Sequence, residues 1–414
     1  MSYEPPLRDY RFVLHEVLKI HDEAEIEGYP DLGPDDTGAI LGEAGRIAAE
    51  VLAPLNASGD REGCTLENGV VRTPSGFREA WALLREGGWP GLECAPEHGG
   101  QGIPTVIGLA VGTMKSAANM AFMMYHGLTH GAYSALHAHG SEEQKAIYLP
   151  KLASGAWMGT MNLTEPQCGT DLGLVRTRAE PDGPDGAHRV TGQKIWISAG
   201  EHDLADNIVH LVLARLPDAP EGTRGLSLFV VPKFLPRETG EAGERNALAC
   251  IGLERKMGIH GNATCVMSYE GATGWLVSEP NKGLKAMFTM MNEARLLVGM
   301  QGLGQAQAAY VQASAFARER LQGRAVTGAE NPDGPADPII VHADVRRMLM
   351  EQKAFVEGGM AVLAWVCMLL DAEHRHEDAA ERKRAADMVA LLTPVVKAFL
   401  TDEGFRLTTV AQQV

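Results

Sequence analysis

Residues 161–171 read MNLTEPQCGTD, and residues 195–198 read IWIS. The first stretch mixes hydroxyl side chains with proline and glycine, which is typical of a tight turn that presents backbone N–H groups. The second stretch places a large aromatic residue beside a hydroxyl in a strand-like run. Taken singly, an ordinary serine/threonine turn and a core tryptophan would explain them, so only their pairing points to a functional site.

Composition limits the kinds of protein that this chain can be. Its 414 residues predict two or three domains. The formal net charge of -16 opposes binding to nucleic acid or to an anionic membrane surface. The sequence lacks an unbroken apolar run of about 18 residues and a basic start followed by an apolar stretch. We therefore expect no membrane insertion and no secretory signal.

Cysteine and histidine spacing gives no metal-binding pattern. The six cysteines are widely scattered, so we expect free thiols in a cytoplasmic protein. Histidines at positions 126, 130, 137 and 139 fall close together in the sequence. Because no carboxylate stands at ligand spacing from them, we expect packing and surface roles and no metal site.

The apolar periodicity changes twice along the chain. A helical pattern, with a capping box at Ser141, gives way near Trp157 to strand-like runs, and helix returns near Gly283. We predict an α+β multidomain fold with an N-terminal helical domain, a central antiparallel β domain and a C-terminal helical bundle. The predicted parts are an N-terminal extension at 1–37, a helical domain at 38–157, the β domain at 158–279 and the C-terminal helices at 280–414.

Three local patterns give further expectations. Thr191-Gly192 separates two strand-like runs and predicts a hairpin turn. Glycines at 299, 302 and 304 lie inside a helical pattern, where each costs about 1 kcal/mol relative to alanine, and close helix packing would compensate. The apolar pattern from Thr401 stops at Val414 with no glycine, proline or basic last turn, so we expect the chain to end inside a helix.

Several motifs, in the same order along the chain, resemble those of the acyl-CoA dehydrogenase family. The two stretches quoted above resemble its flavin-binding segments, V/L-T/S-E-P-x-A-G-S-D and W-I/L-T/S. Residues 91–102 resemble its G-x-x-x-P-E-x-x-G-G-x-G, and residues 191–194 its N-G-x-K, with threonine replacing asparagine. Residues 316–323 resemble its A-x-x-R-x-x-F-G/Q-G segment. The resemblance covers about residues 38–414. The opening of the chain and residues 290–295 are similar to the long branch of the family, which includes a dehydrogenase of 3-methylmercaptopropionyl-CoA.

The resemblance implies an FAD cofactor. By that match, Leu163 and Thr164 would contact the pyrimidine edge of the flavin, Trp196 would cover its ring, and Ser198 would donate towards N5. Hydrogen-bond donors are needed at N1 and the C2 carbonyl of the flavin, because the reduced ring becomes anionic there. Thr170 would lie beside the FAD phosphates or the CoA chain. The other implied FAD contacts are Met161, Gly169 and Ile197.

Further matches concern the subunit interface and the substrate. Arg320 matches an arginine that reaches the FAD pyrophosphate of a neighbouring subunit, which would require a homodimer or homotetramer; the alternative is a solvated residue at a helix end. The family's next FAD-contacting glutamine has no clear match, because His342-Ala343-Asp344 stands there. Asn292 and Arg295 match a helix segment beside the acyl-CoA chain, and Lys285 would line the same channel. A surface salt bridge is the other explanation for Arg295.

The position of the catalytic base stays open. Most of the family carries it in a Y-E-G-T segment that does not occur here. A minority places it just before the arginine matched by Arg295, where this chain has Ala294. Glu293 is a weaker candidate, because it is turned about 100° around the helix. We expect the base beyond Val414, in a longer enzyme, or else a homologue without a base.

The resemblance implies α,β-dehydrogenation of an acyl-CoA to the trans-2-enoyl-CoA, with electrons passed to electron-transferring flavoprotein. Three other functions share the fold: an oxidase that reduces O2, a base-less protein that binds flavin and acyl-CoA, and a DNA-associated flavoprotein. The net charge of -16 argues against DNA binding.

Overall fold

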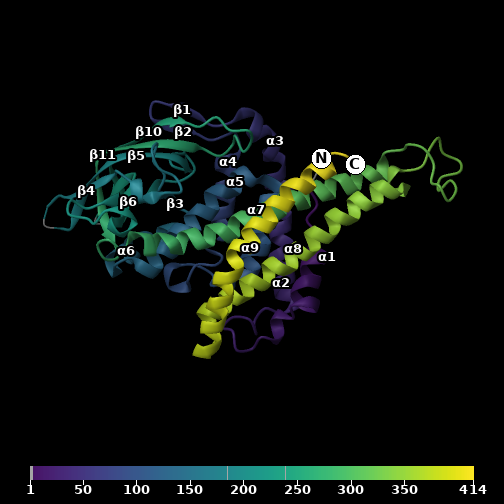
Figure 1. The fold of residues 1–414 in the computed structure, drawn as a ribbon, viewed down its shortest axis with the longest axis horizontal. Helices are drawn as coiled ribbons and strands as arrows, with labels where there is room; N and C mark the ends of the chain where they lie inside the picture. Colours follow the sequence, from purple (N-terminus) through teal and green to yellow (C-terminus); the bar gives the residue numbers. More distant parts are fainter. Residues whose placement is uncertain (1–2, 184, 238) are drawn as a thin grey trace. The chain divides into compact units, whose positions relative to one another are not determined.

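The computed structural model describes residues 3–183, 185–237 and 239–414. The chain divides into two compact units (Figure 1). The helical unit comprises the residues up to 54 together with 103–120 and 295–414, and the sheet unit comprises 55–102 and 121–294. Two long helices, α5 (Thr105–His139) and α7 (Gly283–Glu319), each contribute residues to both units.

Long helices make up most of the helical unit. α8 (Ala343–Arg375) and α9 (Ala379–Ala411) lie side by side (Figure 1). Asp378 caps α9, because its carboxylate accepts the backbone N–H of Ala380 at 2.8 Å. The shorter elements of this unit are α1 (Leu7–Phe12), η1 (Val13–Val17), η2 (Ile20–Asp22), α2 (Pro34–Ile47), η3 (Ala48–Leu52) and η8 (Ile339–Val341).

The helix α5 is interrupted in its middle. Asn119 has φ of -158° and ψ of 89°, so two helical segments meet at this residue. Its side-chain amide donates to the carbonyl of Leu52 at 3.3 Å, which gives the amide a partner in the helical unit. The division between the two units falls just after the interruption, between Met120 and Ala121.

Glycines at 302 and 304 allow α7 to approach its neighbours closely, as the sequence pattern predicted, whereas a Cβ added to Gly299 would lie an ordinary 3.5 Å from the Val396 side chain. A Cβ added to Gly302 would lie 2.6 Å from the carbonyl oxygen of Leu400 on α9, and one added to Gly404 would lie 2.7 Å from the carbonyl oxygen of Gly302. A Cβ on Gly304 would lie 3.1 Å from the backbone nitrogen of Ala117 on α5. Backbone therefore packs on backbone at these crossings.

Replacing Gly302 with alanine is expected to lower the free energy of unfolding by about 1–2 kcal/mol, because the added methyl group would push against the backbone of α9. Gly358 on α8 is the matched control, since it is exposed and, apart from the adjoining backbone of its own helix, no described atom lies within 4 Å of its added Cβ. Gly358→Ala should stabilise the protein by up to about 1 kcal/mol, because alanine is the better helix former. Urea unfolding measures the free energy of unfolding of both variants. Equal stabilisation by the two substitutions would contradict the close packing at Gly302.

The sheet unit holds the strands and the remaining helices. The Ser141 capping box is confirmed at the start of α6, because the serine side chain accepts the Gln144 N–H and the glutamine side chain accepts the Ser141 N–H. The helices of this unit are α3 (Ala53–Glu62), α4 (Phe77–Glu86), η4 (Trp89–Gly91), η5 (Pro96–His98), α6 (Glu142–Ala153), η6 (Leu172–Leu174) and η7 (Gly222–Gly225). The strands are β1 (Thr65–Glu67), β2 (Val70–Arg72), β3 (Trp157–Asn162), β4 (Arg178–Pro181), β5 (Ala187–Ser198), β6 (Asn207–Arg215), β7 (Leu226–Pro232), β8 (Phe234–Pro236), β9 (Ala242–Arg245), β10 (Leu248–Leu253) and β11 (Thr264–Val277).

The main sheet has the strand order β10-β11-β5-β4-β6-β3, and β7 pairs with both β11 and β6. Through β7 the sheet closes on itself as a small barrel. The predicted antiparallel pairing holds except where β6 meets β3 and β4, which run parallel to it. Trp157, Leu211 and Val230 from the strands form one core with Leu149 of α6 and Met287 of α7.

The predicted hairpin turn at Thr191-Gly192 is wrong. Both residues lie inside β5, which pairs with β11 on either side of them. The glycine serves a close approach instead, because a Cβ on Gly192 would lie 2.4 Å from Oγ1 of Thr177. The order of helical, sheet and helical regions that the sequence predicted is confirmed.

Two helices are long and apolar enough to cross a membrane, judged by length and composition alone. They are α5 and α8, whose most apolar windows are 94% and 50% buried in the folded chain. Core helices of soluble proteins commonly meet the same criterion.

Candidate functional site

The turn at residues 161–171 follows directly on β3. The Glu165 N–H donates to the carbonyl of Cys168 at 2.9 Å, and the Cys168 N–H donates back to the carbonyl of Glu165 at 3.0 Å. Pro166 and Gln167 therefore close a two-residue loop. Asp171 then accepts the Gly173 N–H at 3.0 Å, which starts η6. The proline and glycine pattern thus forms the tight turn that the sequence predicted.

A buried ion pair lies beneath this turn. Lys194 on β5 donates from Nζ to Oε1 of Glu165 at 2.8 Å and to the carbonyl of Leu163 at 2.9 Å. The same carboxylate accepts the N–H of Arg176 at 2.7 Å, the N–H of Thr177 at 3.0 Å and the Thr177 hydroxyl at 2.6 Å. The two charged side chains are 0% and 3% exposed. The pair therefore fixes the turn to the sheet.

The ion pair also sets the charge of the carboxylate. Burial acts to raise the pKa of Glu165, but Lys194 and the hydrogen bonds from Thr177 and Arg176 outweigh burial and lower the pKa to about 2. Burial lowers the pKa of Lys194, and Glu165 opposes that shift. Sequence analysis missed this pair, although both residues stand in motifs that it had singled out.

Hydrogen bonds join the turn to the second stretch, residues 195–198. The Ile195 N–H donates to the carbonyl of Thr164 at 2.9 Å, and Oγ1 of Thr160 donates to the carbonyl of Ser198 at 2.9 Å. Leu163 and Ile197 are 9% and 3% exposed, so both residues are buried at this junction. The structure therefore brings together the two stretches that the sequence paired.

Trp196 projects from β5 in a strained backbone conformation. Lys194 and Ile197 are both buried, although alternation along a regular strand would place them on opposite faces. The register to β11 slips between them, so Trp196 lies in a β-bulge. It has φ of 59° and is 60% exposed. A left-handed conformation costs a non-glycine residue about 1–2 kcal/mol, and this exposure shows that Trp196 is not a core tryptophan.

The bulge reverses the ordinary strand preference at this position. Without flavin, the Trp196→Gly variant is expected to be more stable than the Trp196→Val variant by about 1–2 kcal/mol, because only glycine tolerates the positive φ. In a regular strand valine would be favoured. Urea unfolding of the two apo variants measures the difference, and a more stable valine variant would contradict the strained conformation.

Three hydroxyl groups of the turn and of the second stretch are available to a ligand. Within the described part of the chain, no hydrogen bond involves the side-chain hydroxyl of Thr164, Thr170 or Ser198. Thr170 is exposed, and Thr164 and Ser198 are partly exposed. The two remaining sequence candidates, Gly169 and Met161, are exposed and partly exposed, respectively.

The predicted substrate residues share one face of α7. Asn292 lies two turns after Lys285, and Arg295 lies three residues further on, so the three positions are neighbours on the helix surface. Lys285 and Asn292 are exposed, and Arg295 is partly exposed.

Glu293 is engaged by a histidine from α5. Its Oε2 lies 3.3 Å from Nδ1 of His130. Burial acts to lower the pKa of His130, but the carboxylates of Glu293 and the nearby Glu93 more than offset burial and raise the pKa to about 9. His130 is therefore a cation at neutral pH, and Glu293 would have to leave this ion pair before it could accept a substrate proton.

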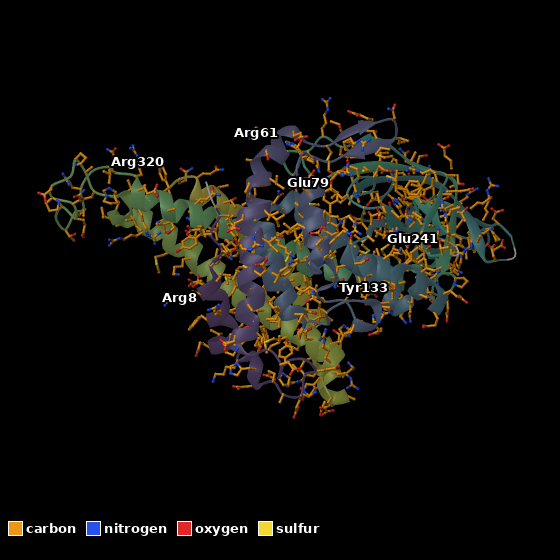
Figure 2. All side chains as sticks on the ribbon, turned by 180° about the vertical axis from the view of Figure 1, so that it is seen from behind. Arg8, Arg61, Glu79, Tyr133, Glu241 and Arg320 are labelled. Atoms are coloured by element: carbon orange, nitrogen blue, oxygen red, sulfur yellow. The ribbon has the colours of Figure 1, made fainter. Side chains whose placement is uncertain are left out.

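Arg320 follows the end of α7 in the helical unit and is labelled in Figure 2. Its N–H donates to the carbonyl of Phe316 at 2.8 Å, so the last helical turn fixes its backbone. The side chain is exposed, and no residue of the described ranges pairs with its guanidinium. At the position without a matching glutamine, Nε2 of His342 lies 2.6 Å from the carbonyl oxygen of Gln322.

Comparisons with known proteins point to one family over the length of this chain. Residues 34–156 match the acyl-CoA dehydrogenase N-terminal domain, and residues 160–272 match the acyl-CoA dehydrogenase middle domain. The chain is 46% identical to the 3-methylmercaptopropionyl-CoA dehydrogenase of Ruegeria pomeroyi, over 100% of this chain and 70% of that protein. It is 36% identical to a butyryl-CoA dehydrogenase of Syntrophomonas wolfei, over 100% of this chain and 69% of that protein.

A solved structure shares the fold. The acyl-CoA dehydrogenase of Bacillus anthracis complexed with FAD has a TM-score of 0.72 and 20% identity to this chain, and the match covers 94% of this chain and 63% of that one.

Proposed function

Since the chain belongs to the acyl-CoA dehydrogenase family, we propose that it oxidises an acyl-CoA to the trans-2-enoyl-CoA with FAD as its cofactor. One observation carries the proposal: an exposed tryptophan on a strained bulge stands beside a hydroxyl-rich turn that a buried ion pair holds rigid. A rigid frame of this kind suits a cofactor whose ring must keep one orientation.

The hydroxyl groups without hydrogen-bond partners among the described residues, together with the exposed Trp196 ring, fit a flavin. FAD, when bound, would supply the redox chemistry by accepting a hydride. Thr164 and Ser198 would donate hydrogen bonds where negative charge develops, and such donors act best when they are already in position. Trp196 would cover one face of the ring and exclude water from it. Arg320 would bind the pyrophosphate on a neighbouring subunit of a homodimer or homotetramer.

We extend the proposal to 3-methylmercaptopropionyl-CoA as the substrate, supported by 46% identity to a dehydrogenase of that thioester. Asn292, Arg295 and Lys285 would line its path, with Thr170 near the CoA chain. Electron-transferring flavoprotein is the proposed electron acceptor.

Anaerobic reduction of the bound flavin tests this proposal. The FAD-loaded protein is mixed with 3-methylmercaptopropionyl-CoA or with butyryl-CoA, and the flavin absorbance is followed. We expect 3-methylmercaptopropionyl-CoA to bleach the flavin at a lower concentration than butyryl-CoA does. Because the base is expected beyond Val414, the same mixing is repeated with a chain extended past that residue. Bound FAD that no acyl-CoA bleaches in the extended chain would overturn the dehydrogenase assignment. Glu293→Gln tests the base within the same assay, because bleaching that persists in this variant excludes Glu293 from proton abstraction.

A second function, binding without turnover, is favoured by one specific observation. Ala294 stands at the position of the minority base, and the adjacent Glu293 is paired with His130. In that case acyl-CoA would shift the flavin spectrum without bleaching it. Oxygen consumption during turnover would instead identify an oxidase of the same fold.

A further inference from the structure

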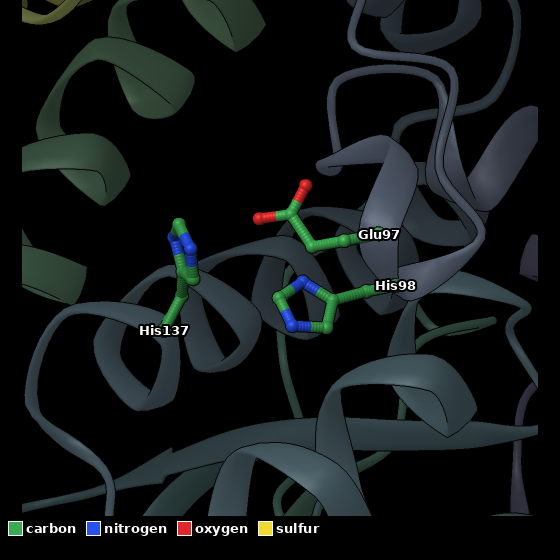
Figure 3. A group of neighbouring side chains, drawn as sticks. All are labelled: Glu97, His98 and His137. Carbon is green, nitrogen blue, oxygen red and sulfur yellow. The ribbon is translucent and has the colours of Figure 1, made fainter. Parts of the chain in front are cut away.

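Three side chains of metal-ligating type converge in the sheet unit, outside the group of residues described above. Glu97 and His98 belong to η5, and His137 belongs to the last turns of α5 (Figure 3). One potential ligand atom from each residue lies within 4.8 Å of the other two. Glu97 and His137 are exposed and His98 is partly exposed, so an ion in solution can reach the group.

Tyr133, one turn before His137 on α5, orients both imidazole rings. Its Oη lies 3.0 Å from Nδ1 of His98 and accepts the N–H of Ala95 at 3.0 Å. Its ring stacks on His137 with centroids 5.7 Å apart at 26°. A partner on one imidazole nitrogen is how proteins orient a ligating histidine, because it leaves the other nitrogen for the metal. The Tyr133 contacts therefore hold the His98 and His137 rings beside Glu97.

The spacing and the local charge suit a single cation. Bonds of about 2.0–2.2 Å to Zn²⁺ place tetrahedral ligand atoms roughly 3.3 Å apart. Atoms within 4.8 Å of one another must therefore close by about 1.5 Å at most, which rotation of the exposed Glu97 and His137 side chains can supply. Lys145, a cation whose charge acts on His137, is itself paired with Glu142 at 2.9 Å.

We propose that Glu97, His98 and His137 bind one divalent transition-metal ion of the Zn²⁺ type, with water completing its coordination. Two imidazoles and one carboxylate are a ligand set of such borderline ions, whereas Ca²⁺ and Mg²⁺ prefer oxygen ligands alone. The ion would clamp η5 to the end of α5. This inference does not depend on flavin binding.

Zinc titration of the purified protein tests the proposed site. Zn²⁺ alone is added in competition with a chromophoric chelator, and one tight equivalent is expected. Glu97→Gln, His98→Gln and His137→Gln should each weaken that binding by at least about tenfold, because each removes one of three ligands. His188→Gln is the matched control, since it removes a histidine of β5 whose ring is hydrogen-bonded to the Gly186 carbonyl. This variant should bind zinc with unchanged affinity.

Two further measurements separate this site from adventitious binding. Substitution with Co²⁺ should give visible bands without thiolate charge-transfer absorption, which distinguishes the proposed ligands from the cysteines. Millimolar Ca²⁺ and Mg²⁺ should not displace the zinc. Absence of tight binding, unchanged affinity in His98→Gln or His137→Gln, a thiolate band, or displacement by Ca²⁺ would each overturn the proposal. Circular dichroism checks that each variant is folded.

Discussion

Replacing Lys194 with methionine is expected to lower the free energy of unfolding by about 3–5 kcal/mol, because it leaves the Glu165 carboxylate buried without its cation. Urea unfolding at pH 7 measures the loss. Lys383→Met is the matched control: Lys383 pairs with Asp387 at 2.6 Å, but both side chains are exposed. An exposed pair contributes about 0–1 kcal/mol, so a similar loss in the two variants would contradict the role of burial.

The loss at Lys194 should also depend on pH. The pKa of Glu165 is lowered from 4.5 to about 2 in the folded protein. Its stabilising contribution is therefore complete above pH 4.5 and disappears as the pH falls towards 2. In Lys194→Met the carboxyl group can be protonated at less cost, so the deficit should shrink in acid. The double variant Glu165→Gln/Lys194→Met should recover part of the stability, because no unpaired charge is then buried.

Alkaline pH is expected to weaken the fold through His130. The pKa of this histidine is raised from 6.5 to about 9 by Glu293 and Glu93, against the effect of burial. A raised pKa gives stability that is complete below pH 6.5 and is lost as the pH rises through 9. The contribution is about 3 kcal/mol at most, at 1.36 kcal/mol for each pKa unit. Urea unfolding between pH 6 and 10 measures it.

The variant His130→Gln isolates this contribution. Its stability should change little between pH 6.5 and 9, because the titrating group is gone. His188→Gln should keep the slope of the unaltered protein. If His130→Gln loses stability over this range as steeply as the unaltered protein does, another group carries the pH dependence.

The local features that the sequence predicted correctly depend on residues close together in the chain. The turn at 161–171 follows from proline and glycine within one loop, and the Ser141 capping box needs only a residue three positions later. The close packing of α7 was also predictable, because glycine at 302 and 304 destabilises a helix and close contact with a neighbouring helix compensates for that cost.

The features that the sequence did not predict depend on long-range pairing. Glu165 and Lys194 lie 29 residues apart, and neither position alone indicates burial. The bulge at Trp196 breaks the alternation from which strand faces are inferred, so the strand pattern by itself did not indicate that this ring is exposed. The approach of Glu97 and His98 to His137 likewise joins a loop to a distant helix, which local ligand spacing does not reveal.

The interruption of α5 at Asn119 has a consequence for backbone amide exchange with solvent. A non-helical residue interrupts the ladder of hydrogen bonds between successive turns, so the two segments need not open together. Amides before Asn119 should become exposed when the helical unit opens, and amides after it when the sheet unit opens. One continuous stretch of sequence would then show two levels of protection, and hydrogen–deuterium exchange along α5 would report the separate stability of each unit.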